Sequence, residues 1–114
     1  MIEKIVLDYL SEKLDVDVCM EYPQKQTSSF VLIEKTGGSE TDNLKSATIA
    51  IQSYASTLYN AALLNENVKT ALRNIIELNS ISKCSLNSDY NFTDTETKQY
   101  RYQAVYDFIY YWKE

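Results

Sequence analysis

The sequence contains no histidine among its 114 residues. Histidine is the most frequent general base in enzymes and a very common metal ligand. Its absence excludes the Ser-His and Cys-His pairs that activate nucleophiles in hydrolases.

Glycine, proline and cysteine are also scarce, with two, one and two residues. Gly37 and Gly38 alone cannot supply a P-loop or a dinucleotide-binding fingerprint. Cys19 and Cys84 lack the CxxC spacing of zinc sites. We therefore predict no metal and no cofactor, and two reduced thiols in a protein without a secretory signal, although the sequence alone leaves a disulfide between them open.

Basic residues are outnumbered, with 11 Lys and Arg against 16 Asp and Glu, for a net charge of −5. Such a chain has no basic patch for phosphate groups, so we predict no specific nucleic-acid binding. The longest uncharged stretch, residues 46–65, contains too many Ser, Thr, Asn and Gln residues for a membrane-spanning helix. We expect no membrane partner.

What the chain does contain is typical of a globular domain, since 45% of the residues are hydrophobic and 24% are charged. Its length suits one core, so residues 1–114 are expected to form a single domain.

Hydrophobic periodicity predicts two helices. Apolar residues recur every three or four positions over residues 2–13, which is typical of an amphipathic helix. The same period returns from about Ser56, over about twenty residues and including Ile76, with Ser53 or Ser56 as the cap and Asn79 as the stop.

Alternating patterns predict five strands. They cover residues 16–20, 30–35, 47–51, 81–86 and 100–112. A loop of about ten residues, from Thr36 to Leu44, should join the second and third strands, because both glycines fall there. Residues 88–99 should form an acidic turn. The predicted fold is α+β in the order α-β-β-β-α-β-β, with both helices on one face of a mostly antiparallel sheet.

The last strand is rich in aromatic residues. Even-numbered residues should form one face, on which Tyr100, Tyr102 and Tyr106 cover the core. Towards its end the strand is apolar on both faces, so Ile109, Tyr111 and Trp112 are candidates for a contact with another subunit.

No catalytic constellation is found. Residues 89–100 resemble a calcium loop only faintly, because Asp94 stands where glycine is needed and Tyr100 where glutamate is needed. Asp15 and Asp17 share a strand face without an apolar pocket to raise their pKa values. We interpret both as solvated surface and predict that the protein is not an enzyme.

Several pieces of the chain, in order, resemble the tail-terminator and tail-completion proteins of long-tailed phages, the family of the lambda minor tail protein U, in versions from prophages of Gram-positive bacteria. They are the first helix, Asp-Val-Cys-Met-Glu-Tyr-Pro (17–23), Phe-Val-Leu-Ile-Glu-Lys-Thr-Gly-Gly (30–38), Ala-Thr-Ile-Ala-Ile-Gln-Ser-Tyr-Ala (47–55) before an Ala-rich helix, and Tyr-Arg-Tyr-Gln-Ala-Val-Tyr-Asp (100–107). The resemblance covers nearly the whole chain, and the family has no catalytic signature.

The resemblance implies a ring, commonly a hexamer, that caps the head-proximal end of the tail tube. The ring stops tube polymerisation and forms the surface onto which head completion proteins dock. The implied partners are the subunit itself, the major tail tube protein and a head connector protein, within a virion assembled in the bacterial cytoplasm. DNA would pass through the ring without specific binding.

A ring needs two different patches that meet on neighbouring subunits. We expect one patch at Ile109, Tyr111 and Trp112. The other is expected in the predicted loop, at Gly37, Gly38 and Leu44.

Two other function classes stay open. An acidic binding module, such as an immunity protein or antitoxin, would use Asp15, Asp17, Glu21 and the acidic turn at residues 89–96 against a basic partner. An enzyme would show turnover that depends on a buried carboxylate.

Overall fold

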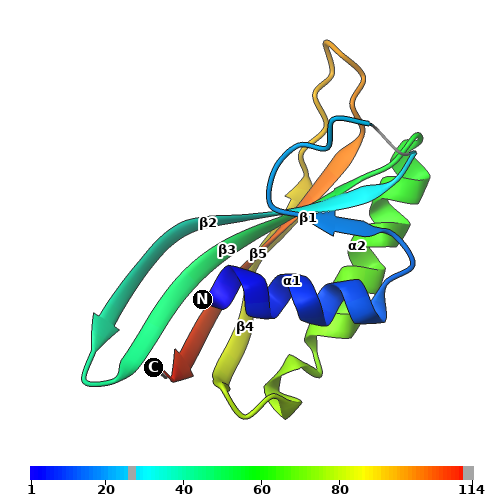
Figure 1. The fold of residues 1–114 in the computed structure, drawn as a ribbon. Coiled ribbons are helices and arrows are strands. Elements are labelled where there is room, and N and C mark those ends of the chain that lie inside the picture. The colour runs from blue at the N-terminus through cyan, green and yellow to red at the C-terminus, as the bar shows by residue number, and fades with distance from the viewer. Residues whose placement is uncertain (26–27, 112–114) are drawn as a thin grey trace.

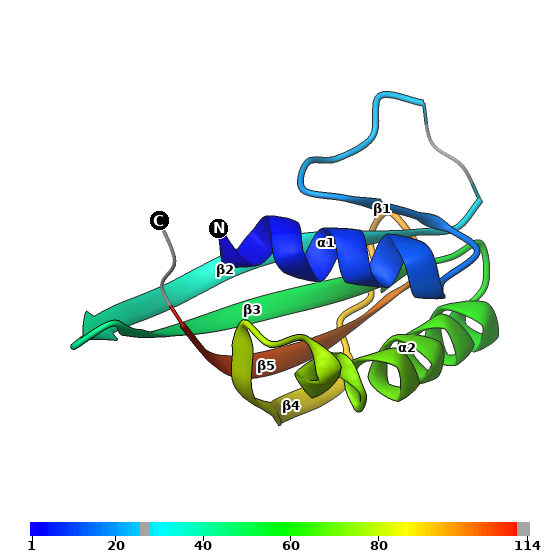
Figure 2. The ribbon, with the colours of Figure 1, turned by 60° about the horizontal axis from the view of Figure 1, so that its bottom comes forward.

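The computed structural model describes residues 1–25 and 28–111. Two helices lie on one face of a five-stranded sheet with the strand order β1-β2-β3-β5-β4 (Figures 1 and 2). Only the β1–β2 pair is parallel. The elements are α1 (Ile2–Lys13), β1 (Asp17–Cys19), β2 (Phe30–Thr41), β3 (Leu44–Tyr54), α2 (Leu58–Leu72), a 3-10 helix η1 (Ile75–Glu77), β4 (Ile81–Asn91) and β5 (Arg101–Tyr111). The predicted α+β class and element order are confirmed.

Helix α1 spans the residues that its periodicity predicted. Its buried side chains, Ile2, Val6, Tyr9 and Leu10, follow the spacing of one helical face. Leu14 adopts an extended conformation and ends the helix. No helix in the described part of the chain is long and apolar enough to cross a membrane.

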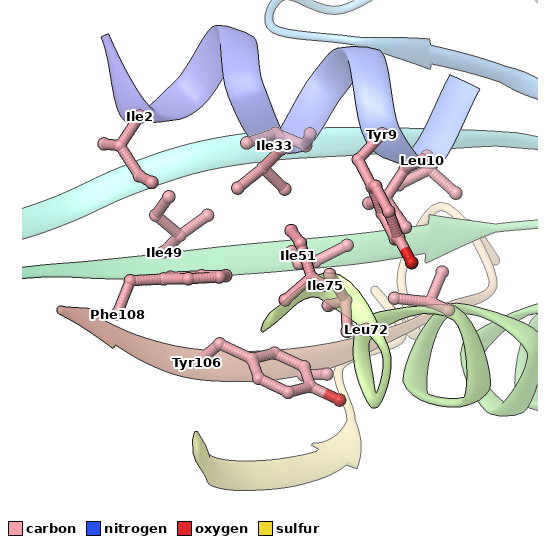
Figure 3. Close-up of a cluster of buried hydrophobic side chains, with 14 of the residues drawn as sticks. Ile2, Tyr9, Leu10, Ile33, Ile49, Ile51, Leu72, Ile75, Tyr106 and Phe108 are labelled. Atoms are coloured by element: carbon pink, nitrogen blue, oxygen red, sulfur yellow. The ribbon is translucent and has the colours of Figure 1, made fainter. Parts of the chain in front are cut away.

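The core lies between the helices and the inner face of the sheet (Figure 3). Strand β5 contributes the even-numbered residues that its alternation predicted: Ala104, Tyr106, Phe108 and Tyr110 are all buried. Phe108 is fully buried, and Tyr102, on the same face, is half-buried. Strand β5 is central, between β3 and β4, which explains why its apolar content is high.

The expected loop between the second and third strands is wrong. Strand β2 continues to Thr41 and pairs with β3 as far as Leu44, so only Asp42 and Asn43 form the turn. Both have positive φ, 48° and 66°, as the mirror-image turns of tight hairpins require. The glycines lie within β2, and a bulge between Lys35 and Gly37 accommodates the change in register.

The second helix is shorter than expected, and its predicted cap is wrong. Thr57, not Ser53 or Ser56, accepts a hydrogen bond from the backbone N–H of Asn60. The regular helix ends at Leu72, before the 3-10 helix η1, so Asn79 is not its stop. Ser53 is instead a buried residue of β3.

Strand β4 is longer than expected, because residues 88–91 continue it instead of starting the acidic turn. Bulges between Ile81 and Lys83 and between Leu86 and Ser88 interrupt its pairing with β5. Both cysteines are free thiols. Cys84 packs against the core, and Cys19 donates a weak hydrogen bond to the carbonyl of Val31.

Candidate subunit interface

The outer face of the sheet is the side opposite α1 and α2. At the hairpin end of this face, the antiparallel register pairs Leu44 with Tyr111 and Ser46 with Ile109. Leu44 and Tyr111 expose 42% and 48% of their surface, and Ile109 is half-buried. The structure therefore brings Leu44, Ile109 and Tyr111 together on one apolar patch, which we call the outer patch. The expectation that Leu44 belongs to a second patch, separate from Ile109 and Tyr111, is wrong, because the register of β3 with β5 places them side by side.

Gly37 and Gly38 lie beside this patch, on β2. Gly38 pairs with Ala47, and a Cβ added there would stand 3.0 Å from the carbonyl oxygen of Ser46. A larger residue at this position would therefore crowd the backbone of β3. A Cβ added at Gly37 would meet open space, so packing does not explain that glycine.

The remaining predicted contact residue, Trp112, lies outside the described residues. The role of all six residues in a subunit contact stays a prediction.

Next to the outer patch is a polar band centred on Asp107. Its carboxylate accepts hydrogen bonds from Asn87 Nδ2 and from Thr48 Oγ1, both at 2.8 Å. These two bonds lower the pKa of Asp107, so the group stays charged well below neutral pH. The band separates the outer patch from the far end of the sheet.

At that far end, aromatic residues cover the outer face without any helix. The rings of Phe30 and Tyr54 stack at 4.5 Å, and Tyr22 meets both edge-on. Arg101 lies over the Phe92 ring at 4.5 Å and donates to Tyr54 Oη at 3.0 Å.

A chain of hydrogen bonds leads from this aromatic cluster across the sheet, from β3 through β5 to β4. Tyr54 Oη donates to Gln52, whose amide donates to Gln103 at 2.8 Å, and Gln103 donates in turn to Tyr90 Oη. Both glutamines are 8% exposed. Strand alternation places them on the outer face, but no sequence signal showed that Tyr54 of β3 and Tyr90 of β4 would bond them.

The helix side carries a groove of about 910 Å³ that sequence reasoning did not predict. It lies between the end of α1 and the second half of α2 with η1. Across it, Tyr9 Oη donates to Glu77 Oε2 at 2.6 Å. Burial, and then the bond to Glu77, raise the pKa of Tyr9 to about 12.

The rim of this groove is partly apolar. Ile76 is 58% exposed there, so its predicted place in the buried stripe of the second helix is wrong. The physical reason is that α2 ends at Leu72, and η1 turns Ile75 inward and Ile76 outward.

The acidic residues of the predicted turn do not form one surface. Asp89 lies in β4 and accepts bonds from Lys69 Nζ at 2.5 Å and from Asn65 Nδ2 at 2.7 Å. Asp94 caps its own turn through the backbone N–H of Glu96. Within residues 1–25 and 28–111 there is no cluster of three acidic or cysteine side chains that could hold a metal.

Comparison with known proteins identified no relative of this chain. No protein-family model matches the chain, and a search of curated proteins found no match.

Proposed function

We propose that the protein is a structural subunit of a phage tail, which assembles into a ring on the head-proximal end of the tail tube and ends its polymerisation. The observation that carries this proposal is the projecting β2–β3 hairpin. All residues of β2 from Glu34 onward are exposed, although the strand is twelve residues long (Figure 1). In the described chain this exposed arm of β2 pairs only with β3, whereas β3 itself stays paired with β5 as far as Leu44. A long exposed arm with a free edge is typical of an element that another chain covers.

The outer patch supports the same proposal. Leu44 and Tyr111 form an exposed apolar pair beside the turn of the hairpin. Apolar and aromatic residues of this kind are enriched at the centres of subunit contacts. The resemblance of the sequence to tail-terminator proteins gives the ring, commonly a hexamer, as the form of the assembly.

The proposed mechanism is steric and not chemical. A ring that binds the last layer of tube subunits covers the surface onto which the next layer would add. Its opposite side then offers a docking surface for the head connector protein. The net charge of −5 would let DNA pass through the lumen, because like charges repel.

The second candidate is a small acidic module that neutralises a basic partner. The ion pair of Asp89 with Lys69, at 2.5 Å, reduces the negative charge that the expected surface of such a module could offer to a basic partner. Asp15, Asp17 and Glu21 remain exposed. Self-association distinguishes the two functions, since a neutralising module acts as a monomer or dimer.

Electron microscopy of the protein mixed with its tail-tube protein tests the proposal. The tube protein alone should form long tubes of varied length. With this protein added, we expect capped tubes of uniform, shorter length. Long, uncapped tubes in the presence of a folded, excess protein would contradict the proposed function.

A further inference from the structure

Two surface features lie towards opposite ends of the molecule. The molecule measures 44 × 25 × 25 Å. At one end is the hairpin tip, which we define as Thr41, Asp42, Asn43 and Leu44. Towards the other end, where the last turn of α1 lies near α2 (Figures 1 and 2), is the groove lined by the end of α1, by α2 and by η1, which we call the helix groove. Two different patches at opposite ends are what a head-to-tail ring requires.

We propose that the helix groove of each subunit receives the hairpin tip of the next subunit in the ring. This inference rests on the proposed function, because it names the contact by which copies of this chain would assemble. The occupant is a second copy of the chain, and the contact is heterologous.

The surface of the helix groove suits an occupant with an apolar residue and a carboxylate. Leu14, Val16 and Ile76 line it with apolar surface. Two cations stand at its rim, Lys13 and Arg73. Within the described residues neither cation forms an ion pair: Lys13 lies 5.4 Å from the centre of the Tyr9 ring, and Arg73 Nη1 meets only Thr70 Oγ1, at 3.5 Å.

The groove also contains two carboxylates, which differ in their contacts. Glu77 accepts the hydrogen bond of Tyr9, so one of its carboxylate oxygens already has a partner. Asp15 is exposed at the rim. The groove is thus electrically balanced within a chain of net charge −5, which makes it one of the less repulsive places for an acidic tip.

The hairpin tip offers the matching groups. Leu44 is 42% exposed and can enter the apolar part of the groove. Glu40, next to the tip, is paired with Lys45 at 3.4 Å. Asp42 is the carboxylate of the tip that forms no ion pair within the described chain, so it is the group that we assign to Arg73 of the neighbour.

The strand edges are poorer candidates for the contact. The bulge between Lys35 and Gly37 distorts the free edge of β2, and two bulges distort the edge of β4. Bulges and charged side chains at an edge oppose pairing with another strand. The side chains of the tip therefore carry the contact in this proposal, and not the backbone of an edge.

Charge exchange tests the inference. Asp42→Lys puts a cation on the tip, and Arg73→Glu puts an anion at the groove. Each variant alone faces like charge in every contact, so we expect its self-association to weaken at least about tenfold. In a mixture, the lysine tip meets the glutamate groove and the aspartate tip meets the arginine groove. The mixture should therefore assemble in alternation, close to the wild-type strength.

Matched controls separate charge from local strain. Asp42→Glu keeps the charge and shares the cost of a larger residue at positive φ. Arg73→Lys keeps the cation at the end of α2. Both controls should assemble as the wild type does, measured by sedimentation velocity, with circular dichroism to show that every variant is folded.

The possible results separate this inference from the proposed function. If the wild type forms no ring, alone at high concentration or on tail tubes, both the tip-to-groove contact and the proposed function are wrong. If the wild type forms rings and Asp42→Lys and Arg73→Glu do so equally well, the tip-to-groove contact is wrong and the proposed function stands. The contact is also wrong if each folded variant fails alone and their mixture does not assemble.

Discussion

The two parts of strand β2 differ sharply in burial. Of its first four residues, Phe30, Val31 and Ile33 are buried, whereas residues 34–41 are all exposed. The same strand therefore begins in the core and ends outside it. The difference teaches that the sheet is longer than the layer of helices that covers it, and that the uncovered end is available to another chain.

The largest loss of stability should come from a substitution in the part of the sheet that the helices cover. Phe108 is fully buried in the core, so Phe108→Ala should lower the free energy of unfolding by about 3–5 kcal/mol. Leu44→Ala, on the uncovered part, should change it by less than about 0.5 kcal/mol. Urea unfolding of the monomer measures both. Equal losses would show that the hairpin belongs to the same stabilising core.

A smaller effect is expected at the groove. Tyr9→Phe removes the hydrogen bond to Glu77 and keeps the packing of the ring, for a loss of about 1.5 kcal/mol. Tyr59→Phe, at a position that is 76% exposed, should cost nothing measurable.

The pKa of Tyr9 gives a second measurement on this variant. In the unfolded chain tyrosine ionises near 10.0, and in the folded protein Tyr9 ionises near 12. The contribution of Tyr9 to the free energy of unfolding is thus fully present below pH 10 and is lost between pH 10 and 12, because in that range only the unfolded state loses the proton. Tyr9→Phe should reduce this fall, and Tyr106, whose pKa is also about 12, should keep part of it. An identical fall in both proteins would contradict the assignment.

The hairpin turn should show a still smaller effect. Asn43 has a φ of 66°, which alanine adopts only at a cost, so Asn43→Ala should destabilise the turn by about 1 kcal/mol. Asn43→Gly accepts this conformation and should be close to neutral. Because the hairpin lies outside the core, amide exchange should accelerate around the turn in Asn43→Ala and stay unchanged in α1. Faster exchange throughout the molecule would show that the two parts unfold together.

The smallest effect concerns the polar band of the outer face. Hydrogen bonds from Asn87 and Thr48 lower the pKa of Asp107 below its unfolded value of 3.8. Their contribution is present above that value and is lost as the pH falls through the folded pKa. Acid titration of stability below about pH 4 should be shallower in Asp107→Asn than in the wild type. The same pH dependence of stability in both proteins would mean that the hydrogen bonds of Asp107 do not stabilise the fold.

Much of the covered part could be predicted from the sequence. Helix α1 and the inner face of β5 follow from apolar spacing alone, because one hydrophobic face was enough to fix each of them. The strand order could not be read from spacing, since the pairing of β3 with β5 depends on contacts between residues about sixty positions apart.

The uncovered part was harder to predict for a physical reason. Gly37 and Gly38 suggested a loop, yet they lie in a strand whose pairing tolerates them. The turn is made by Asp42 and Asn43, and these residue types tolerate positive φ, which was the signal that could have located it. Ile109 and Tyr111 were chosen as contact residues from apolar excess and Leu44 as part of the predicted loop, and the strand register places the three side by side. The helix groove had no sequence signal, because it arises where two distant segments meet.

Hydrogen exchange of the hairpin, before and after assembly, tests most directly whether the uncovered part is a subunit contact. We predict that amide protons of residues 41–44 exchange rapidly in the monomer and slow down in the ring, together with those around Lys13 and Arg73. The buried part of β5 should be protected to the same degree in both states. Rapid exchange of the hairpin in the assembled ring would contradict the account.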